Sequence, residues 1–299
     1  MLNVHPIEID APEAPASPAL AQAIPAMLDR GPSIADRLPI GYFIGAASLM
    51  LCLAAWYLAS LCRLDLYVRF INIPGPDVVF RELFVMGKTA AFYHNVAVSL
   101  WRILAGFLIA TGLGITMGVA IAKNRSLKSA LFPPLEVLRP IPAIAWVPIS
   151  IMLWPTAESS IIFITFIGAF FPIVLNTMHG VASVDKSLIR AAKCLGASEV
   201  ALLRYVVLPG AMPEIFTGLT VGMGVSWVSV ISAEMISGQF GIGYFTWEAY
   251  SLIQYPDIVV GMVVIGVLGL LCSGAIRTVG RLCMPWLTIQ HGSSSNGVR

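Results

Sequence analysis

Six long blocks of this sequence carry no charged residue, and they limit the possible fold more than any other feature. Each block is long enough, or nearly so, to cross about 30 Å of hydrocarbon as a helix that rises about 1.5 Å per residue. The sequence therefore predicts an all-α integral membrane protein whose membrane domain covers about residues 38–285. The six predicted spans are Leu38–Cys62, Ile103–Ala122, Pro140–Ala157, Ser159–Met178, Ile215–Ala233 and Ile258–Ile276.

The composition agrees with a membrane protein. Hydrophobic residues make up 58% of the 299 residues and charged residues only 11%, whereas soluble domains carry about 25% charged residues. The net charge of +2 is too small to indicate a nucleic-acid partner. Residues 1–37, rich in Pro and Ala, predict a disordered cytoplasmic tail and not a signal peptide, because the first apolar block starts late and runs long. Residues 286–299 are predicted to form a second cytoplasmic tail.

Three further patterns refine this outline. The predicted span Pro140–Ala157 holds four prolines, which a span tolerates where neighbouring helices satisfy the freed carbonyls. The segment Pro74–Asn95 predicts an amphipathic external helix that leads into the second span. Two spacings of small residues permit helices to pack closely and are candidates for a dimer face. They are Gly114-x-x-x-Gly118 and Gly218-x-x-x-Gly222.

The distribution of Lys and Arg between the spans predicts which side of the membrane each loop faces. The loops after the second and fourth spans and the segment after the sixth are basic, whereas the loops after the third and fifth spans carry no Lys or Arg. This pattern places both termini in the cytoplasm. The loop after the first span disagrees, because it carries Arg63, Arg69, Arg81 and Lys88.

The loop between the fourth and fifth spans, about residues 183–209, is amphipathic and basic within an otherwise apolar stretch. Asp185 can cap a first helix, and Gly196 can end that helix in the left-handed conformation. Ser198 can cap a second helix, which Pro209 is expected to stop. The small residues around Gly196 would let this helix pair lie in a groove of a soluble partner. A helix pair that lies on the lipid surface is the alternative.

The residue spacing in this loop resembles the cytoplasmic coupling loop of ABC importer permeases, which docks into ATPase subunits. The pattern is Ala191-Ala192-x-x-x-Gly196, nine residues, and then Val206-x-Leu208-Pro209. Arg190 stands where that family has Glu, which puts an acidic contact to the ATPase in doubt, although the docking geometry is expected to survive. The resemblance implies that coupling to the ATPase involves Arg190, Ala191, Ala192, Gly196, Ala197, Val206, Leu208 and Pro209.

Further motifs between about Pro74 and Pro285 resemble the nitrate, sulfonate, taurine and bicarbonate permeases among these importers. They include Ser99-Leu100-Trp101-Arg102, Leu138-Arg139-Pro140-Ile141-Pro142, Phe171-Pro172-x-x-x-Asn176-Thr177, Ala233-Glu234-Met235 and Gly241-Ile242-Gly243-Tyr244. The resemblance implies a six-helix fold of the type I ABC importer permease kind in a bacterial inner membrane. It also implies two copies of a separate ATPase subunit, a second permease copy that forms a homodimer or a related pair, and an external solute-binding protein.

The chain itself is expected to bind no ATP, cofactor or metal, and therefore not to be an enzyme. Gly87-Lys88-Thr89 lacks the earlier glycine that a phosphate loop needs, because Glu82 stands at that position. The four histidines are isolated from one another, and the five cysteines form no Cys-x-x-Cys spacing. Lipid, rather than a cofactor, is the expected non-protein contact.

Charged residues at the ends of the predicted spans are candidates for the transport pathway, because ionisable groups near the bilayer interior are costly. Glu234 ends the fifth span and Arg102 begins the second on the same predicted side. These two residues can lock helices as an ion pair, form part of an external gate, or do both. Arg139, at the cytoplasmic start of the third span, can pair with Glu136 or attract an anion through its planar guanidinium.

Three uncharged side chains complete the candidate pathway. Trp146 and Trp227 lie in the middle of predicted spans, where both simple packing and a role as gate plugs stay open. Asn176 can line the path or form a hydrogen bond between helices.

The leading hypothesis is the permease subunit of an ATP-driven importer for a small oxyanion. A secondary transporter would predict an inverted repeat and several acids within the membrane, which the sequence lacks, and a non-transporting membrane scaffold is the other alternative. Three motifs are closer to alkanesulfonate or taurine permeases, namely Asn176-Thr177-Met178-His179-Gly180, Gly241-Ile242-Gly243-Tyr244 and Ile189-Arg190-Ala191-Ala192. Two motifs are closer to nitrate permeases, namely Ala145-Trp146-Val147-Pro148-Ile149-Ser150 and Gly243-Tyr244-Phe245-x-Trp247-Glu248-Ala249-Tyr250. Sulfonate or taurine is favoured, and nitrate comes next.

Overall fold

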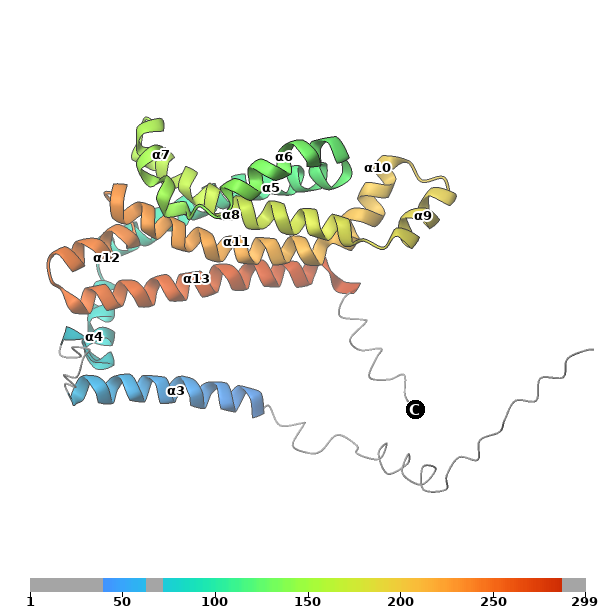
Figure 1. Ribbon diagram of the computed structural model, residues 1–299. Coiled ribbons are helices and arrows are strands. Elements are labelled where there is room, and N and C mark those ends of the chain that lie inside the picture. The colour runs from blue at the N-terminus through green and yellow to red at the C-terminus, as the bar shows by residue number, and fades with distance from the viewer. Residues whose placement is uncertain (1–39, 63–71, 287–299) are drawn as a thin grey trace, which may run out of the picture. The chain divides into compact units, whose positions relative to one another are not determined.

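The computed structural model describes residues 40–62 and 72–286, and the elements within these ranges are all helices (Figure 1). The chain divides into two units, residues 1–62 and 63–299, which are described separately. The described part of the first unit is α3 (Ile40–Leu61), which agrees with the predicted span Leu38–Cys62. The predicted tail 1–37, and 287–299 of the second predicted tail, lie outside the described residues.

The core of the second unit is α8 (Ala157–Ser183), which packs against both α5 (Ala90–Lys123) and α11 (Leu208–Ser237). Small residues let these helices approach closely. A Cβ atom added to Gly118 in α5 would lie 2.7 Å from Thr177 Cβ, and one added to Gly218 in α11 would lie 2.7 Å from Asn176 Cβ. Both predicted small-residue spacings therefore pack against α8 within one chain. Their assignment to a dimer face is wrong, because these faces are already occupied.

α5 and α8 run in the same direction, because Gly106 faces Thr165 and Gly118 faces Thr177 at a constant offset along the two helices. The chain between these parallel helices must therefore return to its starting side. The return is made by α6 (Arg125–Leu138), one 3₁₀ turn (η2, Ala143–Trp146) and α7 (Val147–Leu153). α7 ends beside the start of α8, where the hydroxyl oxygens of Ser150 and Ser160 lie 2.6 Å apart.

The predicted continuous span Pro140–Ala157 is wrong. The two helical parts of this return, Arg125–Leu138 and Ala143–Leu153, are bent by 93° relative to each other. Pro140 and Pro142 lie at the bend, where their missing N–H groups and the extended backbone of Pro142 prevent a continuous helix. The basic segment after α5, expected to be a loop, is instead the first turn of α6, and Asn124 caps it by accepting from the backbone N of Ser126 at 2.9 Å.

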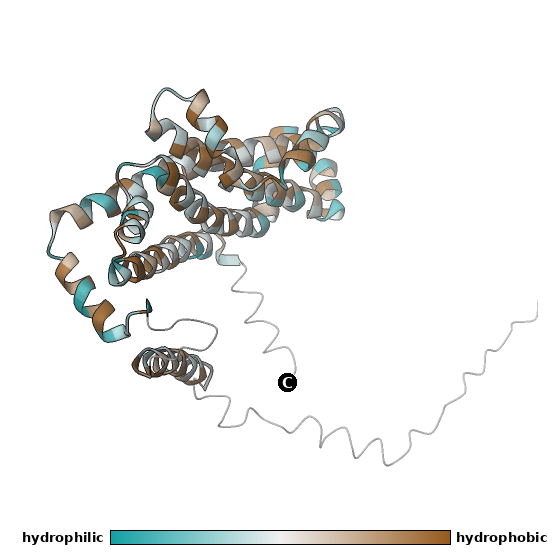
Figure 2. Ribbon diagram, turned by 60° about the vertical axis from the view of Figure 1, so that its left-hand side comes forward, coloured by the Kyte–Doolittle hydropathy of each residue, from teal (hydrophilic) through white to brown (hydrophobic). Residues whose placement is uncertain are grey.

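Five described helices are long and apolar enough to cross a membrane, and six crossings result if the bent pair counts as one. The remaining long helix is α13 (Tyr255–Cys283), antiparallel to α11, with Gly269 beside Trp227 and Gly280 beside Phe216. Figure 2 shows that hydrophobic residues dominate the long helices. Five of the six predicted spans therefore coincide with long helices, most of which extend beyond the predicted blocks, and the bent pair stands in place of the third.

Two short helices differ from the predicted outline. The expected external helix Pro74–Asn95 is interrupted, because α4 (Pro76–Met86) ends at Gly87 and α5 begins only at Ala90. α4 packs against α13. The second, α12 (Ile242–Ser251), was not predicted and follows the turn that ends α11. Its N-cap residue is Gly241, which offers no capping side chain, so the usual local signal for a helix start is missing.

Candidate functional site

The predicted site residues gather mainly at the two opposite ends of α8. Glu158 lies in the first turn of this helix and Asp185 follows its last turn. A helix of this length, 27 residues, spans about 40 Å. Figure 1 shows α9 (Lys186–Cys194) and α10 (Glu199–Leu202) at one end and α12 at the other. We call α9, the Gly196 turn and α10 the elbow.

The capping predicted for the elbow is present. Asp185 Oδ1 accepts from the backbone N of Ser187 at 2.8 Å, and this hydrogen bond holds the pKa of the Asp185 carboxyl below its ordinary value. Ser198 Oγ accepts from the backbone N of Ala201 at 3.3 Å. Gly196 adopts a φ of 79°, the left-handed conformation expected for the end of α9.

Backbone hydrogen bonds explain the spacing between the alanine pair and the glycine. The N–H of Ala197 donates to Ala192 O at 3.0 Å, and the N–H of Gly196 donates to Lys193 O at 3.0 Å. These two bonds form a Schellman motif, which satisfies the last carbonyls of α9 and requires the left-handed residue between them. The direction in which α10 leaves α9 is therefore fixed by the backbone.

The expectation that Pro209 stops the second helix is wrong. α10 continues through one π turn (η3, Leu203–Val207) directly into α11. Proline clashes with the carbonyl four residues earlier in a regular α-helix, and a π turn shifts that hydrogen-bonding pattern. Pro209 also falls in the first turn of α11, where proline is tolerated. The elbow is thus joined to the long helix without a loop.

One side of the elbow packs onto the core and the other is exposed. Leu202 and Val207 are buried in one cluster with Val184 and Ala211. On the opposite side the apolar side chains of Leu195 and Val200 are 88% and 76% exposed. Among the predicted coupling residues, three are exposed and five are partly buried. The exposed ones are Arg190, Ala191 and Gly196, and the partly buried ones are Ala192, Ala197, Val206, Leu208 and Pro209.

Glu199 is an elbow residue that the sequence interpretation missed. Its carboxylate lies 2.9 Å from Lys193 Nζ on α9 and 3.9 Å from Lys123 Nζ at the end of α5. These exposed pairs contribute little stability each, about 0–1 kcal/mol. They nevertheless link three helices at this end. Only the fold brings Lys123 close enough for the second contact.

At the other end of α8 the structure contains the predicted ion pair. Arg102 Nη1 donates to Glu234 Oε1 at 2.9 Å, and the two side chains are 2% and 0% exposed. The same carboxylate accepts from Ser99 Oγ at 2.8 Å and from the backbone N of Gly243 at 2.9 Å. The buried charge of Glu234 is therefore compensated by one cation and two neutral donors.

Arg102 also holds two partners that the sequence interpretation did not assign. Its Nε donates to Glu158 Oε2 at 3.0 Å and its Nη2 contacts Glu158 Oε1, while the Glu158 side chain stays 53% exposed. Its Nη1 donates to Phe240 O at 2.6 Å. The guanidinium therefore joins α5, α8 and the turn between α11 and α12. A signal for Glu158 was available, because this acid begins the fourth predicted span.

The turn before α12 wraps around the Glu234 carboxylate. Gly241 has a φ of 118°, and a Cβ atom there would collide with the carboxylate of Glu234. Asn95 Oδ1 accepts from the backbone N of Gly241 at 2.9 Å, and Ser99 Oγ accepts from the backbone N of Ile242 at 2.9 Å. Glycine is thus required here for both conformation and space, which gives the Gly-Ile-Gly motif a structural reason.

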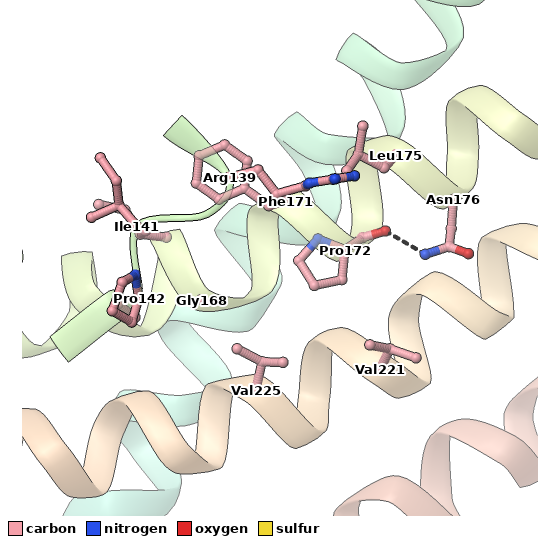
Figure 3. A pocket seen from close by; sticks show the side chains of 12 residues that line it. Arg139, Ile141, Pro142, Gly168, Phe171, Pro172, Leu175, Asn176, Val221 and Val225 are labelled. Atoms are coloured by element: carbon pink, nitrogen blue, oxygen red, sulfur yellow. Dashed lines mark hydrogen bonds between the residues drawn. The ribbon is translucent and has the colours of Figure 1, made fainter. Parts of the chain in front are cut away.

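Arg139 and Asn176 line a pocket of about 370 Å³ beside the middle of α8 (Figure 3). Arg139 follows α6 at the bend, so it does not begin a straight span as expected. Its Nη1 lies 3.4 Å from Glu136 Oε1, the predicted pair. Asn176 Nδ2 donates to Pro172 O in its own helix at 2.8 Å, and Val221 of α11 forms part of the opposing wall.

The two predicted tryptophans do not line this pocket. Trp227 is buried in the core with its ring beside Gly269 of α13, and Trp146 packs against the same core. Neither Nε1 atom has a hydrogen-bond partner within the described residues. The structure therefore places both rings in helix packing. Across residues 40–62 and 72–286, no three His, Cys, Asp or Glu side chains converge as metal ligands would.

Comparisons with known proteins give a consistent result. The family model "Binding-protein-dependent transport system inner membrane component" matches residues 110–286. The bicarbonate transport system permease protein CmpB of Synechococcus elongatus is 37% identical over 70% of this chain and 80% of its own length. The nitrate import permease protein NrtB of Synechocystis sp. is 34% identical over 72% of this chain and 81% of its own length. The taurine transport system permease protein TauC of Escherichia coli is 30% identical over 81% of this chain and 89% of its own length.

One solved structure supports the fold alone. It shows inward-facing conformations of the MetNI methionine ABC transporter and matches with a TM-score of 0.50 at 20% identity. The match covers 62% of this chain and 94% of the compared chain.

Proposed function

Because this chain belongs to the binding-protein-dependent transport system inner membrane components, we propose that it forms the translocation pathway for a small oxyanion. As a member of this family, the chain is a non-enzymatic permease subunit of an ABC importer in the inner membrane. It works with a separate ATPase and a binding protein. Sulfonates, including taurine, are the favoured substrates and nitrate is the next.

The elbow is the observation that carries the proposal. It projects exposed apolar and basic side chains at one end of α8, yet its base is buried and continuous with α11. A surface that only lay on lipid would not need such a rigid connection. In the proposal the ATPase binds the elbow from the cytoplasm. Because no flexible loop separates the elbow from α11, a movement of the ATPase displaces α11 directly. Both chain termini are then cytoplasmic.

The pocket with Arg139 supports an anionic substrate. A guanidinium presents planar donors that match the geometry of oxyanions. Most of the other lining residues are apolar, among them Phe171, Val221 and Val225. A pathway with few fixed charges binds an ion weakly enough to release it, which transport requires. Relatives of this chain are named for nitrate, taurine and bicarbonate, three small anions or zwitterions with negatively charged oxygens.

A second permease copy would complete the pathway. α11 exposes a stripe at helical spacing, which no other described helix of the second unit covers. The stripe consists of Thr217, Val221, Gly224, Val228 and Ile236. Val221 also lines the Arg139 pocket, so a partner facing this stripe would close that pocket. We therefore propose a homodimer with the pathway between the two copies, served by two ATPase subunits.

Transport assays in proteoliposomes test this function. The permease, its ATPase and its binding protein are reconstituted, and ATP-dependent uptake of taurine, an alkanesulfonate, nitrate and bicarbonate is measured. The expected result is ATP-dependent uptake of sulfonate or taurine, reduced in Arg139→Gln and partly kept in Arg139→Lys. Uptake of nitrate or bicarbonate alone would overturn the substrate preference. Uptake that needs neither ATP nor the binding protein would overturn the importer proposal.

A further inference from the structure

A groove of about 450 Å³ lies between α11 and α13 at the elbow end of the second unit. Both helices contribute a face at helical spacing. α11 supplies Phe216 and Thr217, α13 supplies Arg277 and Arg281, and Met284 follows the end of α13. The helices touch at the level of Gly280, where an added Cβ would lie 3.0 Å from the Phe216 ring. The groove is therefore a surface feature of two antiparallel helices that already pack together.

The rim of this groove carries two positive charges that no carboxylate of the described residues compensates. Arg277 and Arg281 lie one turn apart on α13, both exposed, and neither forms an ion pair with any described carboxylate. Among the described residues, Arg277 Nε donates to Ser273 O of its own helix, at 3.3 Å. The acid of α11 nearest in sequence to the groove residues Phe216 and Thr217 is Glu214, and its Cβ faces Gly180 of α8.

The threonines of the groove add no donor for an anion. Thr217 Oγ1 donates to Pro213 O and Thr220 Oγ1 donates to Phe216 O, each at 2.9 Å. The two guanidinium groups must therefore provide the attraction. Guanidinium groups bind phosphate through paired N–H donors.

Below the charged rim the walls are apolar. Phe216, Val221 and the buried side chain of Met284 form them. Little of α13 is covered by other described residues, because only 11% of its most apolar stretch is buried. A free oxyanion would bind the two arginines but leave the apolar walls uncovered. An amphiphile with an anionic head group interacts with both parts of the groove, because its acyl chain covers the apolar walls while its phosphate binds the two arginines.

We propose that this groove is a binding site for an anionic phospholipid, with the phosphate held by Arg277 and Arg281. The acyl chain lies along Phe216 and Met284. The lipid thereby bridges α13 to α11, the helix that continues from the elbow. The groove shares Val221 with the Arg139 pocket and shares Thr217 and Val221 with the α11 stripe, so the second permease copy must cover the stripe without filling the groove.

Lipid competition on the purified full-length chain tests this site. The protein is placed in nanodiscs of mixed phosphatidylglycerol and phosphatidylcholine, and native mass spectrometry reports which lipid stays bound. The wild-type chain is expected to prefer phosphatidylglycerol. Each arginine removed, in Arg277→Gln and Arg281→Gln, is expected to lower this preference about fivefold. The double Arg→Lys variant should keep most of the preference, because it keeps both charges.

A matched control removes two exposed charges elsewhere. Arg125→Gln with Lys128→Gln, at the start of α6, changes the net charge equally and should leave the preference unchanged. An equal loss in this control, or no loss in the double Arg→Gln variant, contradicts the site. Displacement of phosphatidylglycerol by millimolar inorganic phosphate or taurine would assign the groove to a free oxyanion instead. If the double variant is not monodisperse, Arg281→Gln alone gives the same readout.

Discussion

Arg102 Nη1 lies 2.9 Å from Glu234 Oε1, and this ion pair is almost fully buried. The two residues lie 132 positions apart in the sequence and belong to α5 and α11. The pair also organises its surroundings, because Arg102 donates to Glu158 on α8 and Glu234 accepts from the backbone N of Gly243 in the first turn of α12. Four helices thus meet at one charged centre, opposite the elbow.

Removing the cation of this pair should destabilise the protein strongly. Arg102→Ala leaves the buried Glu234 carboxylate without its charge partner, and breaking a buried pair costs about 3–5 kcal/mol. Thermal unfolding of the purified variant in detergent measures this loss. Glu158→Gln is the control, since this half-exposed carboxylate can be solvated, and it should cost far less. Equal stability of Arg102→Ala and wild type would contradict the structural role of the pair.

Removing the anion's charge tests whether the pair also acts in transport. Glu234→Gln keeps the size of the side chain and an oxygen acceptor for Ser99, while Arg102 keeps Glu158. We expect an assembled complex with slowed or uncoupled uptake, because the charge needed to open and close this centre is gone. Uptake and ATPase activity in proteoliposomes measure both effects. Normal uptake by a well-folded Glu234→Gln variant would remove the gate hypothesis and leave a purely structural pair.

Gly241 should be intolerant of any side chain. Gly241→Ala adds a Cβ that collides with the Glu234 carboxylate and is strained at a φ of 118°. We expect a lower unfolding temperature and a weakened Arg102–Glu234 centre. Gly266→Ala is the control in α13, because nothing lies within 4 Å of an added Cβ there. A Gly241→Ala variant as stable as Gly266→Ala would show that the turn does not need glycine.

Gly196 should control coupling rather than folding. Gly196→Ala places a β-carbon on a left-handed residue at a cost of about 1–2 kcal/mol, while the surrounding space is open. The elbow is then expected to change its angle, so that ATPase activity loses its dependence on substrate-loaded binding protein. Gly196→Asn should be milder, because Asn tolerates the left-handed conformation better. Identical coupling in both variants and wild type would argue against a fixed elbow angle.

The sequence predicted best those features that depend on local chemistry. Asp185, Gly196 and Ser198 form the elbow as expected, because caps and left-handed glycines act on their own backbone neighbours. The outcome at Pro209 was not predictable in the same way. Whether a proline ends a helix or enters it through a π turn depends on the packing of the flanking residues, here the burial of Leu202 and Val207.

Contacts that depend on helix direction were harder to predict. The Arg102–Glu234 pair followed from two charges on the same predicted side of the membrane. Glu158 was missed, because its place beside Arg102 requires α5 and α8 to be parallel neighbours. That arrangement in turn depends on the bent return through α6 and α7, which the sequence interpretation treated as a loop and one straight span. For the same reason, Arg139 lies at a bend and not at the start of a straight span as predicted.

Cysteine crosslinking at the elbow tests the central claim most directly. Cys194 is the last residue of α9 and is exposed. In membranes that contain the assembled transporter, a short bifunctional maleimide should join Cys194 to a cysteine introduced in the ATPase, and Cys194→Ser should abolish the product. In intact cells a membrane-impermeant thiol reagent should not reach Cys194. Labelling of Cys194 from outside the cell, or no ATPase adduct in any turnover state, would contradict the proposal that the elbow receives the force of ATP hydrolysis.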